Sequence, residues 1–358
     1  MGRLLRAAGL GLLLTLAMGF LARPAPILGP GGIALHPPAT LLDMKLGTAR
    51  QPFVRRQLVP SMLRAADVII PASWREAATR RLEANRLVRP FLFGADEDES
   101  FDSFLCLIVW FVCFTVFAAV FESETAYYAA EPSAPGLVLS GFPFLFTVFA
   151  CLMLVALLHN NYIYDPPTLC IAALTLRAVR RKRFMQLVLL TALFSLNRET
   201  AFIVPGLAFF AWVHRGQVAI AVRQAALLSI LYLAIAGGLV FHYRHNLGSV
   251  AEDNRTYLIH TYLHKNAKYA LAAILSSAVY LGAVVRCWKL LPPTLKAVQW
   301  FVPLWIAMHI LWGWPMEWRV FFEIYPGMLL TIVAMWTILR GSRPELLVAT
   351  LSDERTLA

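Results

Sequence analysis

The sequence predicts an all-α protein, a polytopic bundle of transmembrane helices. Three observations favour this fold class. Hydrophobic residues make up 59% of the 358 residues and charged residues only 15%, with a mean hydropathy of +0.63, which is more apolar surface than a soluble domain can bury. About ten apolar segments of roughly 12–23 residues follow one another without the alternation typical of β-strands. The formal net charge of +11 comes mostly from short loops between these segments, a pattern that orients membrane proteins.

The first predicted element covers residues 1–22. Its apolar run follows Arg3 and Arg6, which is typical of a signal peptide or of a first span. We expect an uncleaved span or signal anchor, because the run is long and further apolar segments follow. Residues 23–100 are the longest polar stretch. We expect them to form an extracytoplasmic loop, and the helical spacing of apolar residues over 59–88, among many arginines, predicts interfacial helices there.

Residues 101–340 are predicted to form the transmembrane domain, and residues 341–358 a cytoplasmic tail. The densest basic cluster, 180–183, is expected in the cytoplasm with the other basic loops. Alternation from there places 23–100 outside, and it makes 122–136 cytoplasmic although its only charges are acidic. The predicted spans are 101–121, 137–158, 166–179, 185–196, 201–213, 219–241, 268–288, 298–314 and 322–340.

Two of these apolar segments are too short to cross a membrane separately. They lie between the basic clusters at 180–183 and 214–215, have about 12–13 residues each, and rise only ~18–20 Å against a hydrocarbon core of ~30 Å. Both clusters are expected on the cytoplasmic side, so the pair predicts a short re-entrant hairpin. Its tip is Asn197-Arg-Glu-Thr200. We expect the tip to line a cavity that opens outward, because non-helical backbone at membrane depth needs protein or water around it.

The hairpin tip carries the sharpest candidates for a functional site. The guanidinium group of Arg198 can present a planar fork of donors to a phosphate, and Asn197 is a polar neighbour that can bind substrate. Glu199 is adjacent in sequence and would point elsewhere on a helix. It is therefore a candidate catalytic carboxylate that Arg198 need not neutralise. The alternative is that these charges form structural ion pairs with other spans.

A second polar island runs from His159 to Asp165. Asp165 stands before Pro166, and proline suits the first turn of a helix, so one interpretation makes Asp165 the cap of the following span. The other interpretation makes it a carboxylate in the cavity. Tyr164 and His159 would then be its hydrogen-bonding neighbours in the substrate site.

A third island joins tryptophans to charges over residues 312–323. Glu317 and Arg319 follow an aromatic stretch typical of a membrane interface, where they are either solvated or substrate-binding. Glu323 is expected inside the last span, four residues after Arg319, a spacing at which two side chains pair on one helix face. Ionisable groups at membrane depth favour a polar cavity or a charged partner.

The outer loop contributes two basic candidates and one acid. Arg55 and Arg56 precede an amphipathic stretch, where paired arginines suit either a lipid-linked phosphate or ordinary anchoring at the membrane surface. Asp43 lies just upstream and is the earliest acid of this loop. These residues would have to approach the hairpin tip to share a site with Arg198.

Several signals of other function classes are missing. The chain has no phosphate-cradling GxxxxGK[ST] and no dinucleotide-binding GxGxxG unit, so no nucleotide cofactor is expected. Its five cysteines lie in or beside apolar segments without zinc-ligand spacing, so no metal ligands are assigned. The basic balance is that of short membrane loops, so no nucleic-acid partner is expected.

The order of several short motifs resembles a known superfamily. An acid and then Pro-Phe-Val-Arg-Arg-Gln-Leu-Val-Pro lie in the outer loop, and Tyr-Asp-Pro, a basic inner loop, Leu-Asn-Arg-Glu-Thr and Glu-Trp-Arg-Val-Phe-Phe-Glu-Ile-Tyr-Pro follow. This series is similar to that of a group of bacterial multi-spanning proteins which resembles the GT-C glycosyltransferases. The resemblance runs over roughly residues 40–330, and its specificity comes from the order of the motifs.

The resemblance implies an activity and its partners. Such enzymes take sugars from polyprenyl phosphates, which implies transfer from a polyprenyl-phosphate-linked sugar to an acceptor, among membrane lipids, on the extracytoplasmic face of a bacterial inner membrane. An acid in the first outer loop would be the base. Asp43 is the nearest match, but its surroundings lack the aromatic-rich acidic pattern of the superfamily, so Asp165 is the alternative base. Arg55, Arg56 and Arg198 would hold the lipid phosphate. The need for a divalent metal stays open.

Two other function classes fit the same residues. Buried charges and broken helices also mark transport pathways, so a membrane transporter or lipid flippase is one alternative, for which related halves would be expected. The second alternative is a non-catalytic membrane subunit whose charges pair with the spans of a partner protein.

Overall fold

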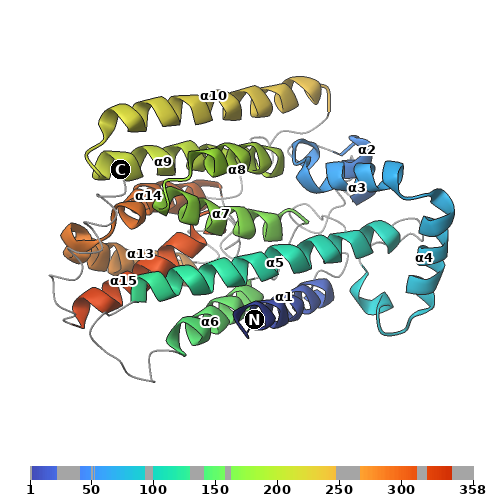
Figure 1. Ribbon diagram of the computed structural model, residues 1–358, viewed down its shortest axis with the longest axis horizontal. Coiled ribbons are helices and arrows are strands. Elements are labelled where there is room, and N and C mark those ends of the chain that lie inside the picture. Colours follow the sequence, from blue (N-terminus) through green and yellow to red (C-terminus); the bar gives the residue numbers. More distant parts are fainter. Residues whose placement is uncertain are drawn as a thin grey trace.

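The computed structural model describes residues 2–21, 41–49, 51, 53–92, 100–129, 141–157, 163–246, 267–312 and 321–340. Within these ranges every regular element is a helix, so the predicted all-α class is confirmed. Figure 1 shows most of the helices running side by side along one direction, with a smaller group of helices at one end.

The helices agree closely with the predicted segments. The smaller group contains α2 (Leu41–Leu46), η1 (Phe53–Arg55), α3 (Leu58–Ile69), α4 (Ala72–Ala84) and η2 (Arg89–Phe91). The bundle contains α1 (Gly2–Leu21), α5 (Ser100–Ala129), α6 (Phe142–Leu157), α7 (Asp165–Arg180), α8 (Phe184–Asn197), η4 (Glu199–Phe202), α9 (Ile203–His214), α10 (Val218–His242), α13 (Ala267–Cys287), η5 (Trp288–Leu290), α14 (Pro293–Trp312) and α15 (Tyr325–Leu339).

Helix α5 differs most from its prediction. The expected span ended at residue 121, whereas the helix continues to Ala129, because residues 122–129 pack on the bundle. Glu122 and Glu124 therefore lie in a helix and not in a loop, and both side chains are buried. Each has arginine partners, Arg6 at 2.7 Å from Glu122 and Arg180 at 2.5 Å from Glu124. These pairs explain why an acidic stretch follows an apolar span.

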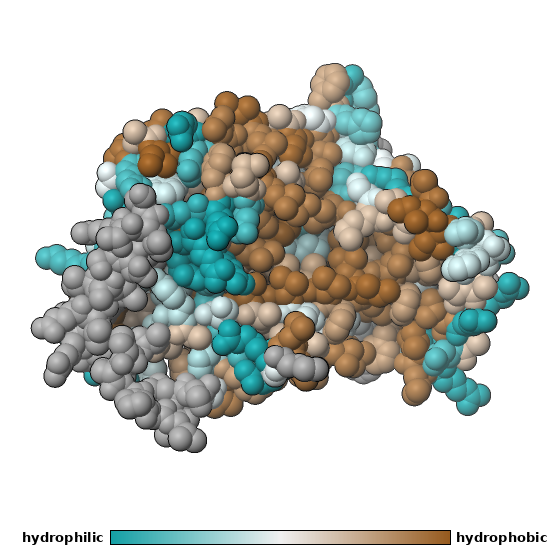
Figure 2. All heavy atoms as spheres, viewed as in Figure 1, coloured by the Kyte–Doolittle hydropathy of each residue, from teal (hydrophilic) through white to brown (hydrophobic). Residues whose placement is uncertain are grey.

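Three helices in the described part of the chain are long and apolar enough to cross a membrane: α1, α5 and α10. A span of the ~30 Å hydrocarbon core needs about 20 residues, and α6, α8, η4 with α9, and α15 are apolar but shorter. The bundle of about ten spans is therefore not established by helix length. Figure 2 shows hydrophobic side chains over the middle of one face and hydrophilic ones toward its two ends. Helix α10 buries only Ala221 and Leu228 of its 25 residues.

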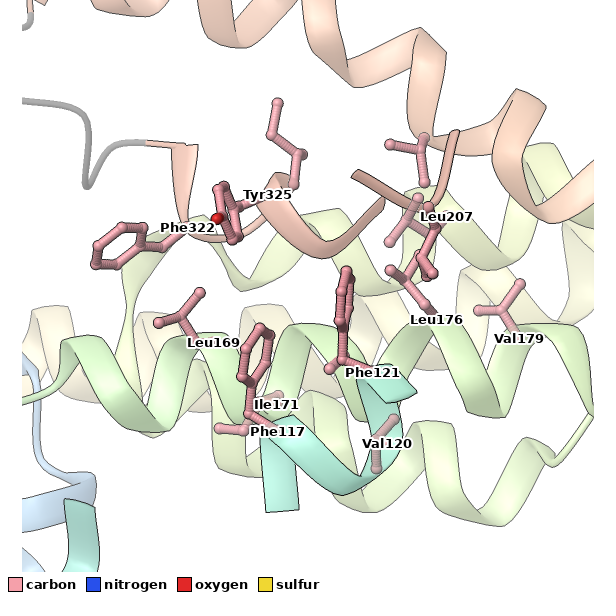
Figure 3. Close-up of a cluster of buried hydrophobic side chains, with 14 of the residues drawn as sticks. Phe117, Val120, Phe121, Leu169, Ile171, Leu176, Val179, Leu207, Phe322 and Tyr325 are labelled. Atoms are coloured by element: carbon pink, nitrogen blue, oxygen red, sulfur yellow. The ribbon is translucent and has the colours of Figure 1, made fainter. Parts of the chain in front are cut away.

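The core of the bundle lies between α5, α7, α9 and the segment before α15. Figure 3 shows the rings of Phe117 and Phe121 pointing from α5 toward Phe322 and Tyr325, with Leu169 of α7 beside them. All five side chains are buried. This packing holds the turn before α15 against the start of α7, where two of the predicted site residues lie.

Helix α1 packs along α5 through a small residue. A Cβ atom added to Gly11 would lie 2.2 Å from Thr115 Oγ1 and 2.8 Å from the Thr115 backbone nitrogen, so only glycine permits this approach. Ala7 and Leu14, which flank Gly11 by about one helical turn, are fully buried. Small residues at such crossings are typical of helix packing in membranes.

The predicted hairpin is present as α8, η4 and α9, and it divides the bundle into two ends. Arg198 is extended, with φ −152° and ψ 148°, and ends α8. We call the end that contains residues 197–202 the tip end. At the other end, called the basic end, the Arg215 guanidinium donates to Val179 O at 3.2 Å and to Thr294 Oγ1 at 3.1 Å. The basic loops after α7 and α9 and before α14 thus meet at the basic end.

The smaller group of helices is fastened to the tip end of α5 by charge. Lys45 Nζ lies 2.6 Å from Asp102 and 2.7 Å from Asp67, and Arg75 lies 2.6 Å from Asp67. Burial lowers the pKa of Lys45, but its hydrogen bonds to the two carboxylates and their negative charges outweigh burial, so the pKa is raised. The interfacial helices predicted over 59–88 correspond to α3 and α4.

Candidate functional site

The tip end contains a buried cluster of charges from segments far apart in the sequence. Arg198 Nη2 lies 2.7 Å from Asp165 Oδ1, and Arg198 Nη1 lies 2.5 Å from Glu323 Oε1. The Arg198 side chain is 10% exposed, and those of Asp165 and Glu323 are 0% and 1% exposed. The structure thus brings together residues from all three predicted segments: Arg198 from the hairpin tip, Asp165 from the second island and Glu323 from the third.

Asp165 reaches Arg198 from the first turn of α7. The N-cap of α7 is Tyr164, and Pro166 and Pro167 follow Asp165 in the first turn. The interpretation of Asp165 as the helix cap was therefore wrong, because its carboxylate pairs with Arg198 instead. The positive end of the α7 dipole stabilises a carboxylate at this position.

Arg198 is held by the residue before it. Asn197 is buried and its Nδ2 donates to Tyr164 O at 3.0 Å and to Thr168 Oγ1 at 2.9 Å. These bonds fix the end of α8 against the start of α7. Because the backbone is extended at Arg198, its side chain leaves the hairpin toward Asp165 and Glu323.

Glu323 lies in the turn before α15, which begins at Tyr325, and not within the last helix as expected. It accepts hydrogen bonds from Thr200 Oγ1 at 2.8 Å and from Trp305 Nε1 at 3.4 Å. Sequence reasoning missed the role of Trp305, because a tryptophan in an apolar helix carries no sign of a polar partner. The pairing of Glu323 with Arg198 also spans 125 positions, beyond any local spacing rule.

A second ion pair lies above this cluster, nearer the surface. Arg56 Nε is 3.3 Å from Glu199 Oε2, and their side chains are 15% and 38% exposed. The Arg56 guanidinium carbon lies 4.1 Å from the centre of the Tyr164 ring, and that of Arg198 lies 5.3 Å from it, so the ring contacts both cations. Tyr232 of α10 donates its hydroxyl hydrogen to Glu199 O at 2.8 Å. The expectation that Glu199 need not neutralise Arg198 is confirmed by these pairs.

The charges of these groups do not cancel. Three carboxylates, those of Asp165, Glu199 and Glu323, face the two guanidinium groups of Arg56 and Arg198, which leaves a net charge of −1 when all are ionised. Both terminal nitrogens of Arg198 are engaged by carboxylates. Glu199 Oε1, in contrast, accepts no hydrogen bond from the described residues. Glu199, whose side chain is 38% exposed, is therefore the most exposed carboxylate of the cluster, although its Oε1 atom is itself buried.

The other predicted site residues lie apart from this cluster or outside the described residues. Arg55 Nη2 donates to Gln51 Oε1, and Gln51 donates in turn to Tyr243 O at the end of α10. Asp43 is in α2, where its Oδ1 accepts a hydrogen bond from Thr48 Oγ1 at 3.4 Å. The residues that lie outside the described part of the chain are His159, Glu317 and Arg319.

No group of three or more histidine, cysteine, aspartate or glutamate side chains is placed to share a metal ion in the described ranges. In the tip-end cluster Asp165 and Glu323 share Arg198, and Glu199 pairs with Arg56. In comparisons of sequence and fold, the chain matches no family model, no curated protein and no solved structure. A function for the cluster rests on its geometry and on the chemistry of its residues.

Proposed function

We propose that this chain is an integral membrane enzyme that transfers a sugar from a polyprenyl-phosphate donor to an acceptor at its tip end. The observation that carries the proposal is the meeting of carboxylates and arginines from four separate segments at one end of an apolar helical bundle. Burying so many charges costs free energy, which the ion pairs offset only in part. Buried charges of this kind are therefore typical of functional sites. The resemblance to the GT-C superfamily supplies the reaction class.

We propose that the shorter apolar helices lie in the membrane together with the three long ones. With the basic end in the cytoplasm, as its arginines favour, α1, α5 and α10 cross the membrane. The shorter α7 runs from the tip end to the basic end, and the hairpin of α8 and α9 enters from the cytoplasmic side. The tip end then faces the extracytoplasmic side of a bacterial inner membrane. In this arrangement polar backbone at the hairpin tip is surrounded by protein, as it must be at membrane depth.

The roles follow from exposure and pairing. Glu199 is the accessible carboxylate, so it removes the proton from an acceptor hydroxyl. The acceptor oxygen then bonds to the anomeric carbon of the sugar as the bond from that carbon to the lipid phosphate breaks. Arg56 stabilises the negative charge that grows on the departing polyprenyl phosphate. Arg198 has no free fork for a phosphate, and it holds Asp165 and Glu323 in place beneath the reacting groups.

A non-catalytic subunit would require different partners for the same charged residues. Its charges would pair with the spans of a partner protein, whereas Arg198 is paired twice within this chain. A transporter would move solute without consuming a donor. Glycosyl transfer uses the partly exposed carboxylate of Glu199 and the guanidinium group of Arg56 together, and we therefore prefer it.

The test is donor consumption by the purified protein in lipid nanodiscs. A panel of radiolabelled polyprenyl-phosphate sugars is supplied with extracted cell-envelope acceptors, with and without divalent cations. We expect release of polyprenyl phosphate from one donor, and a loss of about 100-fold or more in Glu199→Gln, as for removal of a general base. Arg56→Gln should be impaired as well.

The matched controls are Glu76→Gln and Arg80→Gln, which change the same residue types on the exposed surface of α4 and should keep full activity. Unchanged activity of Glu199→Gln would overturn the assignment of the base. Consumption of no donor, together with solute uptake in proteoliposomes, would replace the enzyme by a transporter.

A further inference from the structure

An open groove lies between α4 and the start of α5, away from the charged cluster. Its volume is about 490 Å³, within the range of sites that hold small organic ligands. The groove is lined by Trp74, Ala77, Ala78, Arg81, Leu82 and Phe104. Five of these six side chains are apolar, and Arg81 is the single charge.

The spacing of the lining residues explains the shape of the groove. Trp74, Ala77, Ala78, Arg81 and Leu82 stand at intervals of three and four, so they share one face of α4. The two alanines leave room in the middle of this face, while Trp74 and Leu82 are larger and stand at its two ends. Phe104, one turn into α5, forms the opposite wall.

Helix α4 is held by polar contacts, such as those of Arg75 with Asp67 and of Glu83 with Ser100, and not by buried apolar side chains. None of its residues is buried, and Trp74 is 73% exposed. Nearby apolar side chains are also exposed, namely Val68, Ile69 and Leu87. Tryptophan with adjacent apolar residues is typical of the boundary between lipid tails and head groups, where the proposed membrane arrangement places the start of α5.

The α4 side of the groove is positive, whereas acidic residues precede α5 in the sequence at positions 96–99. Residues 72–92 contain five arginines and two glutamates, a net charge of +3, and Glu83 is engaged by Ser100 Oγ at 2.9 Å. Figure 2 shows hydrophilic side chains along the right edge, where Figure 1 places α4, next to the hydrophobic middle of the molecule. An apolar groove with an arginine at this position fits a molecule with a hydrocarbon chain and a negative head.

We propose that this groove binds one anionic phospholipid. An acyl chain lies against Ala77, Ala78 and Phe104 between Trp74 and Leu82, and Arg81 binds the phosphate. The head group is anionic because arginines near a membrane surface attract negatively charged lipids. The bound lipid fastens α4 to the membrane beside α5. This site is separate from the residues of the proposed transfer reaction, and the two can be tested independently.

The test measures fluorescence quenching of delipidated protein in detergent by lipids with brominated acyl chains. Phosphatidylglycerol is compared with phosphatidylcholine of the same chains, and the signal of the groove is the part of the quenching that disappears in Trp74→Phe. We expect phosphatidylglycerol to quench Trp74 at a lower concentration. Arg81→Gln should weaken phosphatidylglycerol binding about fivefold and phosphatidylcholine binding less, because the choline cation of that lipid already neutralises its phosphate.

Two further variants separate the groove from general adhesion. Ala78→Phe fills the groove and should abolish quenching of Trp74 by both lipids, and it is not expected to unfold the protein because α4 has no buried residue. Arg80→Gln removes an arginine of the same helix that does not line the groove, and it should bind lipid normally. Equal binding of the two lipids, or unchanged binding in Ala78→Phe, would overturn the proposal. A competition result would also overturn it: unbrominated phosphatidylglycerol fails to relieve the quenching of Trp74, while polyprenyl phosphate or glycerol 3-phosphate relieves it.

Discussion

The two ends of the bundle bury charge in different ways. At the basic end the buried carboxylate of Glu122 faces two arginines that reach outward, Arg3 and Arg6, which are 56% and 45% exposed, whereas Arg180 beside Glu124 is 12% exposed. At the tip end the guanidinium of Arg198 is itself buried between Asp165 and Glu323. Long arginine side chains at the basic end can keep their charge near water. At the tip end the guanidinium group of Arg198 has no comparable contact with water.

The signs of the two ends also differ. Glu122 and Glu124 face four arginines at the basic end, namely Arg3, Arg6, Arg177 and Arg180, which leaves a charge of +2. The tip-end cluster carries −1 with three carboxylates and two arginines. An excess of positive charge at a surface serves orientation. The proposed reaction rests on buried charge with a partly exposed carboxylate at its edge, and within the described residues this combination occurs at the tip end.

Removal of the buried arginine should have the largest effect on stability. Arg198→Met leaves the carboxylates of Asp165 and Glu323 together in a buried place without their cation, and we expect the free energy of unfolding to fall by about 3–5 kcal/mol. Denaturant unfolding in detergent micelles measures the change. The triple variant that adds Asp165→Asn and Glu323→Gln removes the unpaired charges and should recover part of the loss. A single variant as stable as the native protein would show that the cluster is solvated.

The corresponding change at the basic end should cost less. Arg180 Nη2 donates to Glu124 Oε1 at 2.8 Å, and its guanidinium carbon lies 3.9 Å from the centre of the Tyr127 ring. In Glu124→Gln an amide oxygen still accepts one hydrogen bond, and the ring contact of Arg180 remains. We expect a loss of about 1–3 kcal/mol, measured in the same unfolding experiment. A loss larger than that of Arg198→Met would reverse the comparison of the two ends.

Local rules of sequence predicted the elements well. Apolar runs and proline positions placed the helices within a few residues, and the adjacency of Arg198 and Glu199 predicted that their side chains diverge. The extended residue Arg198 also falls at the predicted break of the hairpin. These features depend on a few neighbouring residues, so they can be predicted from the sequence alone.

The partners in the cluster could not be predicted in the same way. Spacing favoured Arg319 for Glu323 and a cap for Asp165, yet both acids turn to Arg198, because the core contacts of Phe322 and Tyr325 with α5 and α7 bring the turn before α15 to the start of α7. The length of α5 was missed for a similar reason. Glu122 and Glu124 end an apolar pattern, and only their distant arginines make it possible to bury them.

The outermost charge of the basic end provides the smallest and most selective test. Arg3 Nε lies 3.6 Å from Glu122 Oε1, whereas Arg6 Nη2 lies 2.7 Å from the same oxygen. Arg3→Gln leaves Glu122 paired with Arg6, and exposed ion pairs contribute only ~0–1 kcal/mol, so the unfolding free energy should change by less than about 1 kcal/mol. The same variant in high salt should differ even less from the native protein, because salt screens exposed charges. A salt-independent loss would mean that Arg3 is buried against lipid or a partner, and the basic end would then resemble the tip end.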